Sequence, residues 1–97
     1  MELNRALGEA LRHVRKFRGM TQEDFEPTSG RPYISKIERG LHSPSVEKVA
    51  ELCGQLGVTP TTLFTLAFLI ADGCTDPTEL LSTLKRELKA MGVPEVR

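Results

Sequence analysis

The chain has 97 residues, which is enough for one domain with a modest hydrophobic core. Its 13 basic residues balance its 13 acidic residues, which argues against a protein that holds nucleic acid by bulk charge, since such domains are usually basic. The longest apolar run, residues 63–71, is too short to cross a bilayer, and the charged N-terminus lacks the features of a secretory signal. We therefore expect a soluble cytoplasmic protein that makes no contact with a membrane.

Residues 3–18 are predicted to form an amphipathic helix. Its apolar positions recur every three or four residues, and they are Leu3, Leu7, Ala10, Leu11 and Val14. Gly19 is a suitable C-terminal stop. The cations of the last turn, among them Arg18, complement the negative end of the helix dipole and are also placed to meet phosphate.

A very short second helix is expected to begin after Thr21. This residue is a suitable N-cap, and Asp24, three positions later, completes a capping box. Gln22 is then the first helical residue, with its amide at a helix N-terminus, where anions bind readily. Pro27 disfavours helical geometry at Glu26, so the helix ends there and a turn follows.

The next segment, up to Gly40, is predicted to be a helix with two distinct faces. At the α-helical period the apolar face holds Tyr33, Ile34 and Ile37. The opposite face holds Arg31, Pro32, Ser35, Lys36 and Arg39, with Glu38 on the flank. Guanidinium and ammonium groups on such a face suit base edges and phosphates, although a cationic face is also typical of any solvated helix. The pattern therefore indicates a candidate DNA-recognition helix.

Two further helices are predicted before residue 72. Ser45 caps the first, whose inward residues are expected to be Val46, Val49, Ala50, Cys53 and Leu56. Thr59 and Pro60 start the second, which is apolar almost all round from residue 63 to residue 71. A helix of this kind has to be buried on several sides. We expect it to contact the core on one side and a second subunit on the other.

A last helix is predicted after Asp76-Pro77-Thr78-Glu79, which reads as a capping box. Its apolar residues form one narrow stripe: Leu80, Leu81, Leu84, Leu88 and Met91. Such a stripe suits either the protein's own core or the same helix of a second chain. The candidate residues of a homodimer interface are Leu66, Phe68, Leu69, Ile70, Leu84 and Leu88.

Three segments resemble the Cro/repressor-type (xenobiotic-response-element type) helix-turn-helix family in order and closely in spacing. They are LRHVRKFRGMTQEDF, YISKIERG and SPSVEKVAELCGQLGVTPTTLF. Three such runs in register make the resemblance specific. It implies an all-α fold in which residues 1–71 form a five-helix DNA-binding domain. The last predicted helix would add a C-terminal extension, residues 72–97, that packs on the core or on the dimer interface.

The resemblance also assigns roles to single residues. Those that match base-facing positions of the family are Arg31, Pro32, Tyr33 and Lys36. Arg15 and Glu38 match an ion pair that ties the first helix to the recognition helix. The phosphate candidates are Arg18, Gln22, Ser43 and Ser45, of which the resemblance supplies Gln22.

Residues of the types used in catalysis and metal binding do not cluster in the sequence. Cys53 and Cys74 lack a paired spacing, and no nucleophile–histidine–acid set can be assembled from His13 and His42. We therefore expect no enzyme activity, no metal and no cofactor, and two reduced thiols rather than a disulfide.

These patterns favour a sequence-specific transcriptional regulator, a repressor that binds a palindromic operator in double-stranded DNA as a homodimer. Two alternatives stay open. One is the antitoxin of a toxin–antitoxin pair, which would also bind a protein partner. The other is a protein-interaction module that keeps the fold without DNA binding, which the zero net charge and Pro32 favour somewhat.

Overall fold

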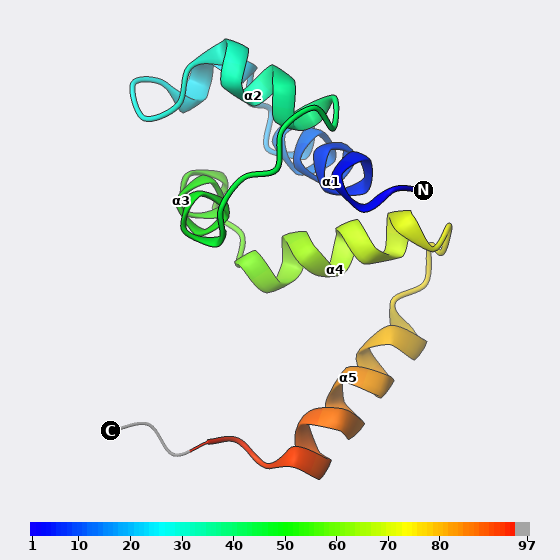
Figure 1. Ribbon diagram of the computed structural model, residues 1–97. Helices are drawn as coiled ribbons and strands as arrows, with labels where there is room; N and C mark the ends of the chain where they lie inside the picture. Colours follow the sequence, from blue (N-terminus) through cyan, green and yellow to red (C-terminus); the bar gives the residue numbers. More distant parts are fainter. Residues whose placement is uncertain (95–97) are drawn as a thin grey trace.

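The computed structural model describes residues 1–94, which form helices and no strand (Figure 1). The elements are α1 (Leu3–Phe17), the 3₁₀ turn η1 (Gln22–Phe25), α2 (Arg31–Glu38), α3 (Val46–Leu56), α4 (Pro60–Ala71) and α5 (Thr78–Met91). The predicted all-α class, with five helical elements and an added C-terminal helix, is confirmed. The C-terminal extension predicted for residues 72–97 is described as far as residue 94, and its remainder lies outside the described residues.

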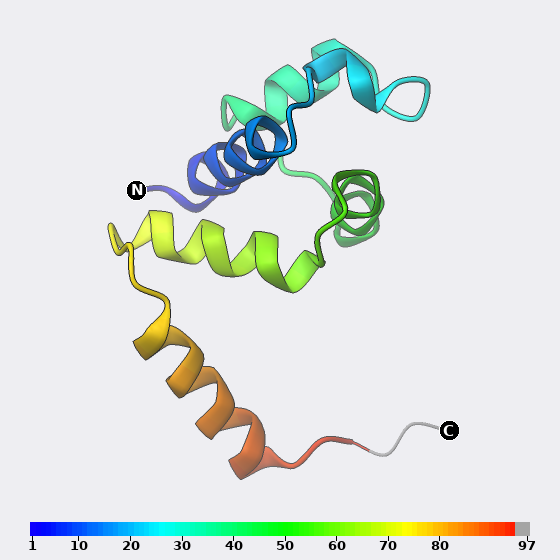
Figure 2. The ribbon, with the colours of Figure 1, turned by 180° about the vertical axis from the view of Figure 1, so that it is seen from behind.

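The core of the protein lies where α1 runs between α2 and α4 (Figures 1 and 2). The largest fully buried side chains are Phe25, Leu11, Ile34, Ile37, Leu52, Leu56, Leu63 and Cys53. They come from every element except α5. Burying each such aliphatic or aromatic side chain contributes about 1.5–3 kcal/mol of transfer free energy, so this shared core positions α2.

The backbones of α1 and α2 touch at Gly8. A Cβ atom placed there would lie 2.3 Å from the carbonyl oxygen of Ile37 and 2.7 Å from that of Glu38. Only a residue without a side chain allows this approach. The position of α2 on α1 is therefore fixed by backbone contact as well as by side-chain packing.

The helix boundaries follow the local signals in the sequence. α1 ends before Gly19, which has a positive φ of 69°. The backbone N–H of Thr21 donates to Asp24 Oδ2 at 2.7 Å, as a capping box requires. Ser45 and Thr59 accept hydrogen bonds from the first turns of α3 and α4. Local capping chemistry thus fixes where these elements begin and end.

The inward face predicted for α3 was partly wrong. Val46 is 72% exposed and Ala50 is exposed, whereas Leu52, which was not expected inside, is buried. The buried stripe is centred on Val49 and Leu56 and extends toward Leu52. At 100° per residue, the predicted face was rotated away from the side that packs into the shared core.

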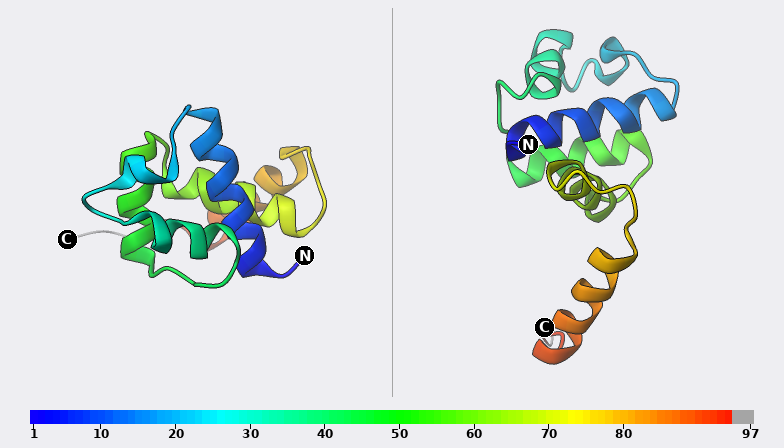
Figure 3. Two further views of the ribbon diagram at one scale, coloured as in Figure 1. Left: turned by 90° about the horizontal axis from the view of Figure 1, so that it is seen from above. Right: turned by 90° about the vertical axis from the view of Figure 1, so that its right-hand side faces the viewer.

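The two C-terminal helices bury much less than their sequences suggested. α4 buries only Leu63 and Ala67, and Phe68 is 46% exposed, so the expectation of burial on several sides is not met within one chain. α5 buries no residue and points away from the rest of the molecule, opposite α2 (Figures 1 and 3). No single helix of residues 1–94 is long and apolar enough to cross a membrane. Only α3 and α4 together have sufficient apolar length, and they are bent by 104°.

Candidate nucleic-acid interface

The outer face of α2 is a cationic surface at one end of the molecule. Arg31, Lys36 and Arg39 are exposed, as is Pro32 in the first turn, while Ile34 and Ile37 on the opposite face are buried. Gly30 occupies the N-cap, and proline is tolerated in the first turn because its missing N–H would have no helical partner there. The segregation predicted from the sequence puts these side chains where a groove of DNA can reach them.

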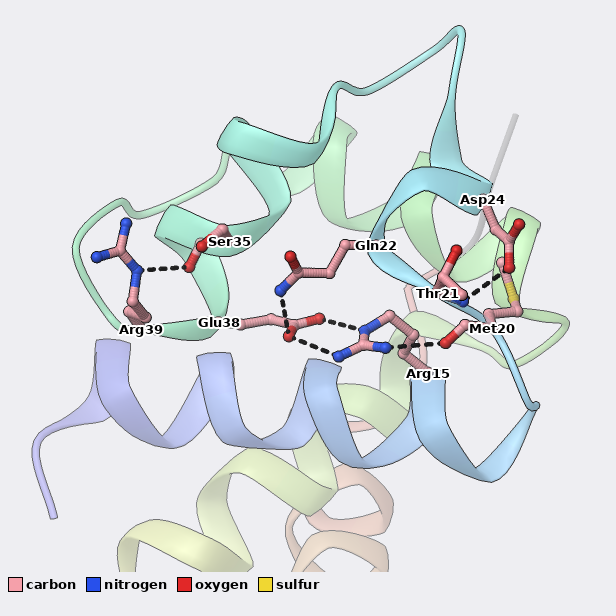
Figure 4. A network of polar contacts seen from close by, with 8 residues as sticks. All are labelled: Arg15, Met20, Thr21, Gln22, Asp24, Ser35, Glu38 and Arg39. Carbon is pink, nitrogen blue, oxygen red and sulfur yellow. Dashed lines mark hydrogen bonds and ion pairs between the residues drawn. The ribbon is translucent and has the colours of Figure 1, made fainter.

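A buried polar network holds the inner side of this helix (Figure 4). Arg15 Nε lies 2.7 Å from Glu38 Oε2, and Arg15 Nη2 donates to Glu38 Oε1 at 3.0 Å, so the pair is bidentate. Arg15 Nη1 also donates to the carbonyl oxygen of Met20 at 2.8 Å. The hydrogen bond with Glu38 raises the pKa of Arg15, and burial opposes that rise. The structure thus brings together the two residues expected to join the first helix to the recognition helix.

Gln22 lies in the same network. Its Nε2 donates to Glu38 Oε1 at 3.0 Å, which turns the side chain toward the end of α2 (Figure 4). The amide has a second N–H and an oxygen beyond this bond. A phosphate contact from Gln22 therefore stays a prediction, and it would be made by an amide already oriented by Glu38.

Arg31, the first residue of α2, pairs with a residue that sequence reasoning missed. Its Nε lies 3.1 Å from Oε1 of Glu23 in η1. Both side chains are well exposed, 64% for Arg31 and 53% for Glu23. No period or motif relates these two positions, because the turn between η1 and α2 brings them together.

Tyr33 contacts protein groups as well as solvent. Its ring packs edge-on against His42 with 5.0 Å between centroids, and Lys48 Nζ lies 5.4 Å from the ring centroid. Lys48 also donates to Ser29 Oγ at 2.9 Å, which links α3 to the turn before α2. The half-buried Tyr33 therefore supports the position of α2, and its contact with bases stays a prediction.

The remaining phosphate candidates lie in two places. Ser43 is exposed in the loop before α3, and Ser45 accepts from Lys48 N while capping that helix. Arg18 instead donates to the carbonyl oxygen of Gly57, beyond the other end of α3, at 3.1 Å. The structure therefore does not place Arg18 beside the two serines.

Comparison with known proteins agrees with this geometry. Residues 11–63, more than half of the chain, match the helix-turn-helix family. A relative from Sinorhizobium fredii (strain NBRC 101917 / NGR234), described as the uncharacterized HTH-type transcriptional regulator y4dJ, is 36% identical over 67 residues. That match covers 67% of this chain and 87% of the relative.

Two crystal structures of the clp gene regulator ClgR from Corynebacterium glutamicum are also similar. One is 35% identical with a TM-score of 0.66 and covers 69% of this chain and 88% of the ClgR chain. The other is 29% identical with a TM-score of 0.70, and it covers 94% of this chain and 95% of the ClgR chain. A match over 94% of this chain has to include most of α5. The chain belongs to the Cro/repressor-type family of helix-turn-helix, DNA-binding transcriptional regulators.

Proposed function

We propose that the protein is a sequence-specific repressor in the cytoplasm, which binds a palindromic operator as a homodimer and blocks polymerase there. The observation that supports this proposal is the division of α2 into an exposed cationic face and a face fixed by the buried Arg15–Glu38 pair. A helix held in one position can present side chains to base edges with little loss of conformational entropy on binding.

Within this proposal, the residues of α2 and its surroundings divide into two groups. Arg31 and Lys36 read base edges in the major groove, with Pro32 and Tyr33 making apolar contacts. Gln22, Arg18, Ser43 and Ser45 contact phosphates and set the orientation on the duplex. The exposure of Lys36 and the partial burial of Tyr33 are consistent with these roles.

The proposed homodimer uses the apolar surface of α4 and α5. Phe64 and Phe68 line two adjoining hollows on this surface: one reaches Pro44 and Val46, and the other lies between α4 and Leu84. The wider set of interface candidates remains Leu66, Phe68, Leu69, Ile70, Leu84 and Leu88. Because α5 points away from α2, a dimer joined only at the end of α5 would hold the recognition helices further apart than one joined through α4. Half-site spacing distinguishes the two.

The test is selection of bound duplexes from a randomised library, followed by binding measurements on the selected sequence. The double variant Arg31→Ala, Lys36→Ala should lose most specific binding, since each bidentate base contact accounts for about 1–3 kcal/mol of discrimination. The matched control is Lys85→Ala, Arg86→Ala, which removes the same charge from exposed positions of α5 and should bind as the wild type does. Wild-type affinity should also fall on the order of 10³-fold between low and moderate salt.

Other outcomes would redirect the proposal. A folded wild-type protein that selects no sequence would contradict DNA reading and favour the protein-interaction module. Tight association with a small protein that also alters operator binding would favour the antitoxin. Selection of single, unpaired half-sites would contradict the homodimer while leaving sequence-specific binding intact.

A further inference from the structure

Two adjacent residues of η1 bind the two ends of the recognition helix. Gln22 donates to Glu38, the last residue of α2, at 3.0 Å. Glu23 Oε1 forms an ion pair with Nε of Arg31, the first residue of α2, at 3.1 Å. The first contact is partly buried and belongs to the Arg15–Glu38 network, whereas the second is exposed. The buried contact thus fixes η1, and with it the position from which Glu23 reaches Arg31.

The geometry of the exposed pair leaves the reading groups of Arg31 free. The ion-pair contact of Glu23 is with Nε of Arg31, so the four N–H groups of Nη1 and Nη2 remain for other acceptors. Guanine presents two acceptors, O6 and N7, on its major-groove edge, and a guanidinium reads them with two parallel hydrogen bonds. A carboxylate beside Nε attracts the guanidinium from that side without competing for the atoms that would make those bonds.

The negative charge of Glu23 is unfavourable for general binding to DNA. A carboxylate on a DNA-facing surface repels the phosphate backbone, and an exposed ion pair adds little to folding stability. The short turn nevertheless places Glu23 against the one arginine at the start of α2. The cost to general DNA affinity is offset if the carboxylate improves discrimination between bases.

We propose that Glu23 is a positioning residue that orients the Arg31 guanidinium to read a guanine. The inference rests on the proposed function, because it concerns the same DNA-reading surface. Glu23 itself makes no base contact in this scheme and acts through Arg31.

The experiment is parallel selection from one randomised duplex library with the wild type, Glu23→Gln, Arg31→Ala, Arg31→Lys and Glu23→Gln combined with Arg31→Ala. The wild type should select a guanine at one position of each half-site, and both Arg31 variants should lose that preference. Glu23→Gln should weaken it by about fivefold or more, within the range that one bidentate contact provides. In the Arg31→Ala background, Glu23→Gln should change nothing further at that position.

Glu26→Gln is the matched control, because it removes the same charge from an exposed residue of the same segment. It should raise affinity for all duplexes alike and leave the selected sequence unchanged. The melting temperature of Glu23→Gln should equal that of the wild type, which separates orientation of Arg31 from a loss of folding stability.

Three results would overturn the inference alone. Glu23→Gln could raise affinity for all duplexes and keep the selected sequence, as Glu26→Gln should, which would mean that Glu23 acts only by repelling phosphates. It could alter preference at a different base pair, which would mean that Glu23 reads a base directly. Arg31→Ala could keep the guanine preference, which would remove the residue that Glu23 is said to orient. A wild type that selects no sequence would instead overturn the proposed function, and this inference with it.

Discussion

The two ends of the molecule differ in how far one chain satisfies its own side chains. Around α2, Arg15 pairs with Glu38 at 2.7 Å, and Gln22 donates to the same carboxylate. At the opposite end α5 buries no residue, and Leu88 is 48% exposed. At the α2 end the buried polar groups have their partners within the chain, whereas the α4–α5 end exposes apolar side chains to solvent.

The two ends differ in what would stabilise them further. A buried network with all its partners present restricts the helix to one arrangement, because a broken hydrogen bond in the interior is costly. An exposed apolar stripe gains free energy only when another surface covers it. One end is therefore held in one arrangement by its own side chains, and the other leaves apolar side chains exposed, which is the basis of the proposed homodimer.

Removing Glu38 should disrupt the first end most strongly. Glu38→Ala leaves the Arg15 guanidinium buried without its carboxylate, which typically costs about 3–5 kcal/mol. The matched control, Glu23→Ala, breaks an exposed pair and should cost about 1 kcal/mol or less. Urea unfolding of both variants measures the two free energies of unfolding. Equal losses would contradict the structural role of the buried pair.

Filling the close approach of α1 and α2 should have the next largest effect. Gly8→Ala places a methyl group 2.3 Å from a carbonyl oxygen of α2, and overpacking of this kind costs about 1–3 kcal/mol. Gly54→Ala on α3 is the control, since a Cβ there meets no atom within 4 Å and alanine favours a helix by about 1 kcal/mol. Opposite signs of the change in melting temperature are expected. A stabilising Gly8→Ala would contradict the backbone contact.

The apolar end is tested by the double variant Leu84→Gln, Leu88→Gln. It should leave the monomer fold intact, because neither side chain is buried, but it should weaken the proposed homodimer at least about tenfold, since burying one leucine is worth about 1.5–3 kcal/mol. Lys85→Gln, Lys89→Gln is the control on other positions of α5. Sedimentation equilibrium measures both dissociation constants, and equal values for the two variants would remove α5 from the interface.

The sequence predicts those parts of this contrast that depend on residues close together along the chain. The boundaries of α1 and the cap at Thr21 follow from neighbouring residues, and they were predicted correctly. The two faces of α2 follow from helical period, although Tyr33 is only partly buried. The Arg15–Glu38 pair, 23 residues apart, came from resemblance to a family rather than from a local rule.

The start of α5 is a local feature that was predicted wrongly, because Pro77 is its N-cap and the capping box expected at residues 76–79 is not formed. The other features that the sequence did not predict depend on tertiary contacts. The partner of Arg31 was missed because the turn geometry decides it, and Arg18 reaches Gly57 across 39 residues. The face of α3 was misplaced because the core shared with α1, η1, α2 and α4 decides which stripe is covered. The exposure of α5 was also unpredictable, since an apolar stripe suits the protein's own core and a second chain equally well.

The two cysteines provide the smallest expected effect, because Cys53 of α3 is buried in the core and Cys74 is exposed. Burial raises the pKa of the Cys53 thiol above its ordinary value of 9.0, whereas Cys74 lies exposed before α5. Above about pH 9 the unfolded chain therefore releases the Cys53 proton while the folded chain retains it. Folding stability should then fall with rising pH until the folded pKa is reached, by at most about 1.4 kcal/mol per pH unit from this group.

Unfolding free energies between pH 8 and pH 10 measure the slope. Cys53→Ala should reduce that slope despite its lower overall stability; a slope unchanged in Cys53→Ala would mean that other groups cause the alkaline loss.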